Sequence, residues 1–121
     1  MIQDEKDKLI ALFADETRWC RGVDAADQHG RAVHYNDENA VSWDIVGGLC
    51  HLFGWRRASE LFSSISRHLT GKHLAAAPLE NQRITAMSAL LDFNDDDHTT
   101  YGLMMTRLRE LPVWHRPHVL T

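Results

Sequence analysis

Cysteine is scarce in this chain of 121 residues, and its positions follow no recognised motif. The two cysteines, Cys20 and Cys50, could form at most one disulfide bond, and neither lies in a Cys-x-x-Cys or other metal-ligand spacing. We therefore expect two reduced thiols, as is usual in the cytoplasm, and we interpret both residues as small apolar residues of the core.

Long hydrophobic runs are also missing. The longest mostly apolar run without a charge, "IVGGLCHLFGW" from Ile45, has eleven residues, whereas a helix needs about 20 to span a bilayer. The first residues, "MIQDEK", carry charges at once and contain no apolar segment of the signal-peptide type. These absences predict a cytoplasmic location and no contact with a membrane.

Positive charge is not in excess, since the formal net charge is −4. Proteins that bind duplex nucleic acid need Lys and Arg to displace the counterions of the phosphates, so the charge argues against that class of partner. The charges are also unevenly distributed, because residues 55–73 are mainly basic whereas residues 92–97 contain four aspartates and no base. This asymmetry favours a protein partner, head-to-tail association of like chains, or an anionic partner.

Known catalytic motifs are absent as well. The chain contains no Gly-x-Ser-x-Gly elbow, P-loop, dinucleotide fingerprint or Cys/His nucleophile pattern. Its eight histidines reproduce neither a His-Glu-x-x-His helix nor a Cys/His finger, so only a convergence in three dimensions could build a metal site. We therefore predict no cofactor and no metal ligands.

The composition is that of a single globular domain, with 44% hydrophobic and 25% charged residues. Helical periodicity predicts a mainly α fold, a bundle of about five helices over residues 1–121. A loop or small β-hairpin is expected at about 19–35, turning at Asp27–Gly30. The tail 112–121 is expected to be extended. The expected helices cover roughly residues 3–15, 36 or 37 to 53, 56–70, 78–91 and 100–111.

The second expected helix, capped by Asn36 or Asp37, is apolar on two sides and is therefore predicted to be central. One stripe contains Trp43, Val46, Cys50 and Phe53, and the other contains Val41, Ile45, Leu49 and Leu52. A narrow strip between the stripes holds Ala40, Asp44, Gly47, Gly48 and His51. Each glycine inside a helix costs about 1 kcal/mol relative to alanine. The pair therefore predicts close approach of a backbone, a ring or a ligand, with Trp19 or Trp43 nearby.

Asp44 and His51 share this strip. They are seven residues apart, so they would lie two turns apart on one side of a helix, about 10 Å along its axis. That distance is too long for a direct hydrogen bond, although both side chains could touch one small ligand. They either mark the hydrated edge of the helix or form an acid–base or ligand-binding pair.

The stretch "LLDFNDDDHTTYG", residues 90–102, concentrates carboxylates between two apolar segments. An EF-hand loop requires Gly at position 6 and Glu at position 12, and no starting point in this stretch provides both. The favoured interpretation is helix punctuation, with Asn94 ending one helix in the left-handed conformation and Asp97 or Thr99 capping the next. A weak magnesium or hydroxyl-binding site and an acidic patch that faces a partner remain alternatives.

Four motifs in sequence order resemble a family of small uncharacterised bacterial helical proteins, a domain of unknown function. The motifs are "RWCRG", "DQHGRAV", "AVSWDIVGGL" and "LLDFNDDDHTTYGLMMTRLREL", and together they span most of residues 18–111. The chain departs from the family pattern at Asp44, where a Cys is expected, and at Gly102, where a Glu is expected. The resemblance implies a bacterial cytosolic protein but no reaction. The matching positions are Trp19, Gly30, Arg31, Trp43, Gly47, Asn94 and Asp95.

The sequence thus favours a non-enzymatic cytosolic helical domain that binds a protein partner or a small ligand. The alternative is a small metal-dependent or acid–base hydrolase that uses Asp44, His51 and the Asp92–His98 cluster. The candidate ligand-binding residues are Trp19, Arg31, Trp43, Asp44, His51, Asn94 and Asp95.

Overall fold

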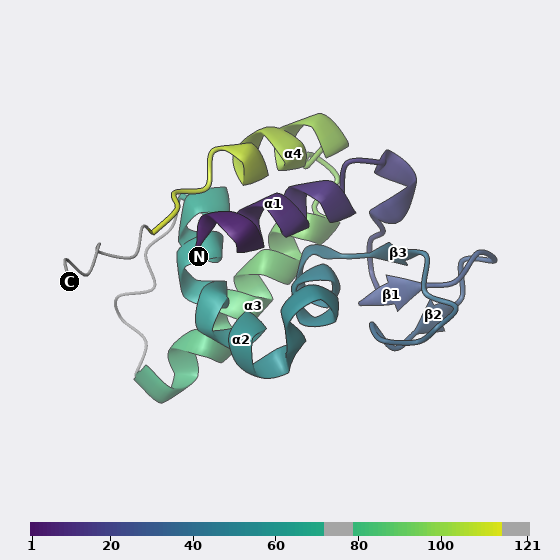
Figure 1. Ribbon diagram of the computed structural model, residues 1–121, viewed down its shortest axis with the longest axis horizontal. Coiled ribbons are helices and arrows are strands. Elements are labelled where there is room, and N and C mark those ends of the chain that lie inside the picture. Colours follow the sequence, from purple (N-terminus) through teal and green to yellow (C-terminus); the bar gives the residue numbers. More distant parts are fainter. Residues whose placement is uncertain (72–78, 115–121) are drawn as a thin grey trace, which may run out of the picture.

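The computed structural model describes residues 1–71 and 79–114 of the chain. Four α-helices dominate this part, and Figure 1 shows them gathered at one end of the molecule, with three short strands at the other end. The mainly helical class predicted from the sequence is confirmed. The elements in order are α1 (Gln3–Leu12), a short 3-10 helix η1 (Glu16–Arg18), β1 (Ala25–Ala26), β2 (Ala32–Val33), β3 (Ser42–Trp43), α2 (Ile45–Thr70), α3 (Leu79–Asp95) and α4 (Tyr101–Arg109).

Helix α1 lies where the sequence predicts a helix, although it ends before residue 15. Its buried Glu5 accepts a hydrogen bond from the backbone N–H of Ile2 (3.0 Å) at the helix start. The same carboxylate accepts two hydrogen bonds from the guanidinium of Arg57 on α2, at 2.7 and 2.8 Å. This pair joins α1 to the second half of α2, and α4 lies along the other side of α1 (Figure 1).

The expected hairpin is present. Strands β1 and β2 pair in antiparallel fashion, and the turn closes through a hydrogen bond from the N–H of Gly30 to the carbonyl oxygen of Asp27 (3.0 Å). Gly30 has a φ of 78°, a left-handed conformation that glycine adopts without steric cost. The sheet order is β2-β1-β3, so β1 is the central strand.

Strand β3 corrects the predicted start of the second helix. Residues 42–43 pair with β1, and the helix begins only at Ile45, not after Asn36 or Asp37. Asp37 instead accepts a hydrogen bond from the N–H of Asn39 (2.8 Å), as an aspartate in a turn does. A turn and a helix cap use the same side-chain acceptor, so the local sequence could not distinguish them.

Helix α2 contains both the second and the third expected helix, so the prediction of five helices is wrong for the described residues. Gly54 interrupts α2 with φ 78° and ψ 161°, values far from those of a helix. The sequence identified this glycine correctly as a breaker. The chain nevertheless continues directly from Gly54 into the second half of α2, and no loop separates the two halves.

The last two helices lie where the sequence predicts them, although α3 ends at Asp95 and not at residue 91. Pro78 lies outside the described residues, and α3 begins at Leu79. Helix α4 is one residue shorter at its start and two residues shorter at its end than expected. At the beginning of the predicted tail, the N–H of Trp114 donates to the carbonyl oxygen of Met1 (2.8 Å), and the remainder of that tail lies outside the described residues.

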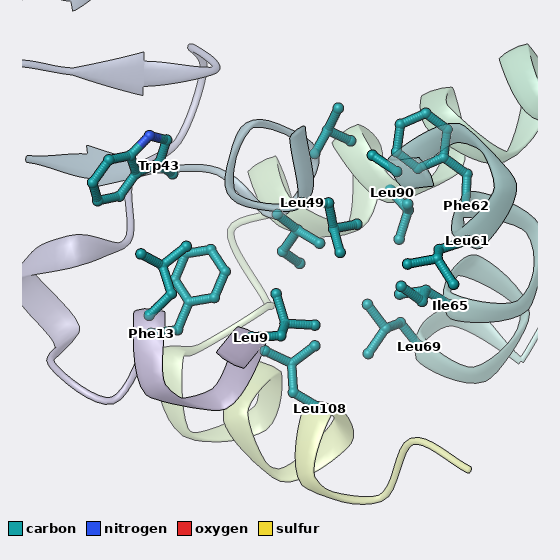
Figure 2. Close-up of a cluster of buried hydrophobic side chains, with 14 of the residues drawn as sticks. Leu9, Phe13, Trp43, Leu49, Leu61, Phe62, Ile65, Leu69, Leu90 and Leu108 are labelled. Carbon is teal, nitrogen blue, oxygen red and sulfur yellow. The ribbon is translucent and has the colours of Figure 1, made fainter. Parts of the chain in front are cut away.

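The hydrophobic core lies between the helices and extends to the base of the sheet. Figure 2 shows Leu9 and Phe13 of the α1 region facing Leu49 and Trp43, with Leu108 beneath Leu9. The central position of the first half of α2 is confirmed, since residues 45–50 are all buried. Val41, in contrast, lies outside the helix and is exposed. Within the described residues, no helix combines the length and apolar character needed to cross a membrane.

Candidate functional site

Asn94 is buried where the end of α3 meets the start of α2. Its side-chain oxygen accepts hydrogen bonds from Trp19 Nε1 (2.7 Å) and from the backbone N–H of Ile45 (3.0 Å). Its side-chain nitrogen donates to the carbonyl oxygen of Cys20 (3.0 Å) and to Asp95 Oδ1 (2.9 Å). Both acceptor and both donor positions of the amide are therefore used. We call this arrangement of five residues the Asn94 junction.

Arg21 closes the Asn94 junction on its outer side. Its Nε donates to the carbonyl oxygen of Asn94 (3.3 Å), and its Nη2 donates to the carbonyl oxygen of Thr99. The guanidinium carbon lies 4.8 Å from the ring centre of Trp19, within the range of a cation–π contact. Arg21 was not a candidate in the sequence analysis. Its place directly after Trp19 and Cys20 is the only signal in the sequence that pointed to it.

The Asn94 junction brings together three of the sequence candidates, namely Trp19, Asn94 and Asp95. Asp95 also accepts a hydrogen bond from the backbone N–H of Gly22 (2.9 Å), so it binds the loop after Trp19 as well as Asn94. The junction is thus a structural link between segments that are more than 70 residues apart in the sequence. Its polar side chains donate to and accept from protein groups.

Asp44 is the N-cap of α2 and has only 1% of its surface exposed. Its Oδ1 accepts a hydrogen bond from the N–H of Gly47 (2.5 Å), and its own N–H donates to the carbonyl oxygen of Asp24 (3.1 Å). Burial raises the pKa of the Asp44 carboxyl to about 7, and the carboxylates of Asp24 and Asp95 act in the same direction. The hydrogen bond from Gly47 opposes this shift but does not overcome it.

The glycine pair of α2 lies against neighbouring protein, as the sequence predicts. A β-carbon built on Gly47 would overlap the carbonyl oxygen of Asp24, and one built on Gly48 would lie 2.7 Å from the ring of Phe13. Trp43 lies near the strip, as expected, because its ring stacks on His51 with centres 4.5 Å apart, but it is not what the two glycines pack against. The nearest atoms belong to Asp24 at Gly47 and to Phe13 and Leu12 at Gly48.

Trp43 and His51 form a separate pair. Their rings are stacked, with centres 4.5 Å apart and planes inclined by 22°. Trp43 Nε1 donates to the carbonyl oxygen of Tyr35 (2.9 Å), and His51 Nδ1 lies 3.3 Å from Asn36 Oδ1. His51 is exposed whereas Asp44 is buried, so the two residues of the expected acid–base pair have different environments.

Arg31 stands apart from the other candidates. It belongs to the hairpin turn, where its backbone N–H donates to Asp27 Oδ1 (2.9 Å) and its carbonyl oxygen accepts from the N–H of Asp27 (2.9 Å). Its side chain is exposed, and the structure describes no contact between it and another candidate residue.

The acidic segment after α3 differs in detail from its predicted role as helix punctuation. Thr100 caps α4 by accepting a hydrogen bond from the N–H of Leu103 (3.1 Å), so the expectation of Asp97 or Thr99 as the cap is wrong. Asn94 is inside α3, and no described residue other than glycine has a positive φ, so Asn94 does not end the helix in the left-handed conformation. Asp96 forms a local turn by accepting from the N–H of His98 (2.7 Å).

Among the residues that the structure describes, no group of three or more His, Cys, Asp or Glu side chains is placed to hold a metal ion. The Nδ1 of His98 lies 3.1 Å from Asp96 Oδ1. His73, His115 and His118 lie outside the described residues. The described part therefore offers no three-dimensional convergence of the kind that a metal-dependent hydrolase would need.

A surface pocket of about 340 Å³ lies between the end of α2, the last turns of α3, and α4. The buried Leu69 and the half-buried Phe93 form its apolar side. Asp92 and Asp96 contribute carboxylates, and Arg107 contributes a guanidinium that donates to the carbonyl oxygen of Leu69 (2.8 Å). The two acids belong to the Asp92–His98 cluster of the hydrolase alternative. Arg107 was not a candidate, because in the sequence it looks like an ordinary basic residue in the last turn of a helix.

No family model, curated protein or solved structure matches this chain. The resemblance to a family of small bacterial helical proteins therefore stays a prediction, as does the location in the cytoplasm.

Proposed function

We propose that this helical domain is a non-enzymatic binding protein whose ligand is a small zwitterionic molecule with an apolar body, such as an apolar amino acid or a short apolar peptide. The pocket between α2, α3 and α4 carries this proposal. Small-molecule sites are concave, largely apolar and fitted with a few polar groups that fix the orientation of the ligand. The volume of about 340 Å³ suits a ligand of this size.

The charges in the pocket support this ligand class. No ion pair within 4.0 Å joins Arg107 to Asp92 or Asp96 among the described contacts, although all three residues line the pocket. Opposite charges that share a pocket without neutralising each other complement a ligand that carries both signs. The carboxylate of the ligand would bind Arg107 and its ammonium group would bind the aspartates, while its apolar body would cover Leu69 and Phe93.

Binding is favoured over hydrolysis because the reactive residue types identified in the sequence serve the fold. Asp44 caps α2 and is buried, and Asn94 uses all four positions of its amide on protein groups. A substrate could not reach Asp44 without displacing the loop around Asp24. The hydrolase alternative would require that rearrangement before any chemistry.

A two-dimensional NMR titration of the ¹⁵N-labelled chain tests the proposal. We expect millimolar leucine or phenylalanine to shift the backbone signals of Leu69, Phe93 and Arg107. The same amino acids with an acetylated amine and an amidated carboxyl should not shift them, because both charges are then absent. Signals that are unchanged by every probe, or that move equally with the blocked amino acids, would contradict the proposal.

Matched variants locate the site. Arg107→Gln should remove the response to leucine, because it removes the cation that binds the carboxylate. Arg109→Gln changes an exposed arginine on the same helix outside the pocket and should leave the response intact. Asp92→Asn should weaken the response, and Asp97→Asn is its exposed control. Thermal unfolding of each variant must show that loss of the contact between Arg107 and Leu69 has not unfolded the site.

An exposed aromatic residue supports a protein partner as a second candidate function. Trp55 follows the break in α2, has 55% of its surface exposed and packs edge-on against Phe62. The adjacent Arg56 is exposed as well. Trp and Arg are the residue types that most often dominate the binding energy of protein interfaces. Sedimentation of the parent and Trp55→Ala chains tests self-association, which the variant should weaken if this surface binds a second copy.

A further inference from the structure

Two carboxyl groups are buried in the described part of the chain, and their surroundings differ. The carboxylate of Glu5 is paired with a cation, since the guanidinium of Arg57 donates two hydrogen bonds to it and lowers its pKa to about 2. Asp44 is more deeply buried than Glu5, and the described residues include no cation within 4.0 Å of it. A buried charge without a partner is strongly disfavoured, so the site of Asp44 suits the neutral carboxyl.

The groups around Asp44 are acidic or neutral. Asp24 in the loop before β1 and Asp95 at the end of α3 bring carboxylates close to it. Cys20 and Cys50 are the neighbouring thiols, from the Trp19 loop and from α2. Burial raises the pKa of both thiols, that of Cys50 to about 11, so both stay protonated near neutral pH.

The remaining charged neighbours do not compensate Asp44. Arg21 directs its guanidinium to the carbonyl oxygens of Asn94 and Thr99. His51 on α2 stacks its ring on Trp43, the residue before Asp44.

The loop around Asp24 covers Asp44. The carbonyl oxygen of Asp24 accepts the N–H of Asp44 (3.1 Å) and touches the backbone of Gly47, while the N–H of Cys20 donates to the carbonyl oxygen of Trp43 (3.0 Å). Separation of this loop from α2 would admit water to the carboxyl. It would also increase the distance from Asp44 to the carboxylate of Asp24.

We propose that the contact of the Asp24 backbone with the first turn of α2 is a pH-controlled latch, closed while the Asp44 carboxyl is neutral and opened when that carboxyl ionises. The raised pKa of about 7 places this event near neutral pH. The closed form holds the proton more tightly than the open form, in which the solvated carboxyl has an ordinary pKa of about 4. The ratio of open to closed latch therefore rises about tenfold with each pH unit from about pH 4 to about pH 7 and is constant above that range, where both forms are ionised.

NMR of the full chain between pH 5.5 and 8.5 tests the latch. We expect the backbone signals of Cys20 and Asp44 to change with one shared midpoint near pH 7. Hydrogen-exchange protection of the Asp44 N–H, corrected for the intrinsic exchange rate, should fall about tenfold per pH unit below the midpoint and become constant above it. No shared transition in this range, or protection that is constant with pH, would overturn the proposal.

Three variants assign the transition to Asp44. Asp44→Asn keeps an acceptor for the N-cap but cannot ionise, so the transition should disappear. Asp24→Asn removes a like charge and should move the midpoint to lower pH, which also tests the proposal if Asp44→Asn fails to fold. His51→Gln should leave the transition in place. A transition that survives in Asp44→Asn, or that is lost in His51→Gln, would show that another group controls it.

Discussion

Replacement of Gly47 by alanine should destabilise the protein by about 2–4 kcal/mol. The new methyl group would overlap the carbonyl oxygen of Asp24 and lie 2.7 Å from its carbonyl carbon, so the two backbones would have to separate. Overpacking of this kind costs about 1–3 kcal/mol, and loss of the hydrogen bond from the N–H of Asp44 to Asp24 adds about 1–3 kcal/mol. The higher helix propensity of alanine returns only about 1 kcal/mol.

Gly48→Ala should cost less, about 1–2 kcal/mol. The new methyl group would lie 2.7 Å from Phe13 Cζ and 3.0 Å from Leu12 Cδ2, which are the ends of side chains and not backbone atoms. Gly102→Ala is the matched control on α4. Its nearest neighbour would be Thr100 Oγ1 at 4.0 Å, so the substitution should be neutral or stabilise by up to about 1 kcal/mol.

Urea denaturation followed by far-UV circular dichroism measures these differences as shifts of the midpoint at a constant m-value. The expected order of decreasing stability is Gly102→Ala, parent, Gly48→Ala and Gly47→Ala. If Gly47→Ala were as stable as the parent with the same m-value, the loop around Asp24 could not lie against α2 as described.

Two further substitutions test the polar contacts between segments. Asn94→Ala should cost about 2–4 kcal/mol, because it leaves several buried hydrogen-bonding groups unpaired, whereas Asn36→Ala at an exposed side chain should cost almost nothing in the same urea assay. Because Arg57 lowers the pKa of Glu5 in the folded state, the stability from this pair is present above about pH 4.5 and is lost as the pH falls toward about 2. Glu5→Gln should therefore cost about 1–2 kcal/mol at pH 7, a value reduced because solvent reaches Arg57. The variant should also make the stability less dependent on pH in the acid range. The exposed control Asp4→Asn should not change that dependence. If Asn94→Ala and Asn36→Ala lost the same stability, the buried role of Asn94 would be contradicted. If Glu5→Gln and Asp4→Asn changed the acid side of the profile equally, the pairing of Glu5 with Arg57 would be contradicted.

Short-range signals in the sequence located several elements correctly. The turn Asp27–Gly30 was identifiable because an aspartate and a glycine at this spacing form a turn without help from the rest of the chain. Gly54 was identifiable as a helix breaker because this signal is also local to the sequence. The glycine pair at Gly47 and Gly48 predicted a close approach, because only a packing constraint justifies two such residues inside a helix.

Long-range contacts explain what the sequence did not disclose. Trp43 continues the apolar pattern of the following helix, yet the pairing of residues 42–43 with β1 holds it in a strand. The partner of Gly47 is the main chain of Asp24, and a backbone group leaves no side-chain signature in the sequence. Similarly, Trp19 and Asn94 could be chosen from their motifs, but their mutual hydrogen bond spans 75 residues and no local pattern encodes it.

The glycine at position 47 and the buried carboxyl at position 44 have one structural cause. The carbonyl oxygen of Asp24 accepts the N–H of Asp44 and occupies the space in which a side chain of residue 47 would stand. The same approach removes water from the Asp44 carboxyl, and that burial is the main reason for its raised pKa. The strip between the apolar stripes of α2 is therefore filled by the backbone of this protein. A ligand is more readily accommodated at the other end of α2, between Asp92 and Arg107, where a pocket of about 340 Å³ remains.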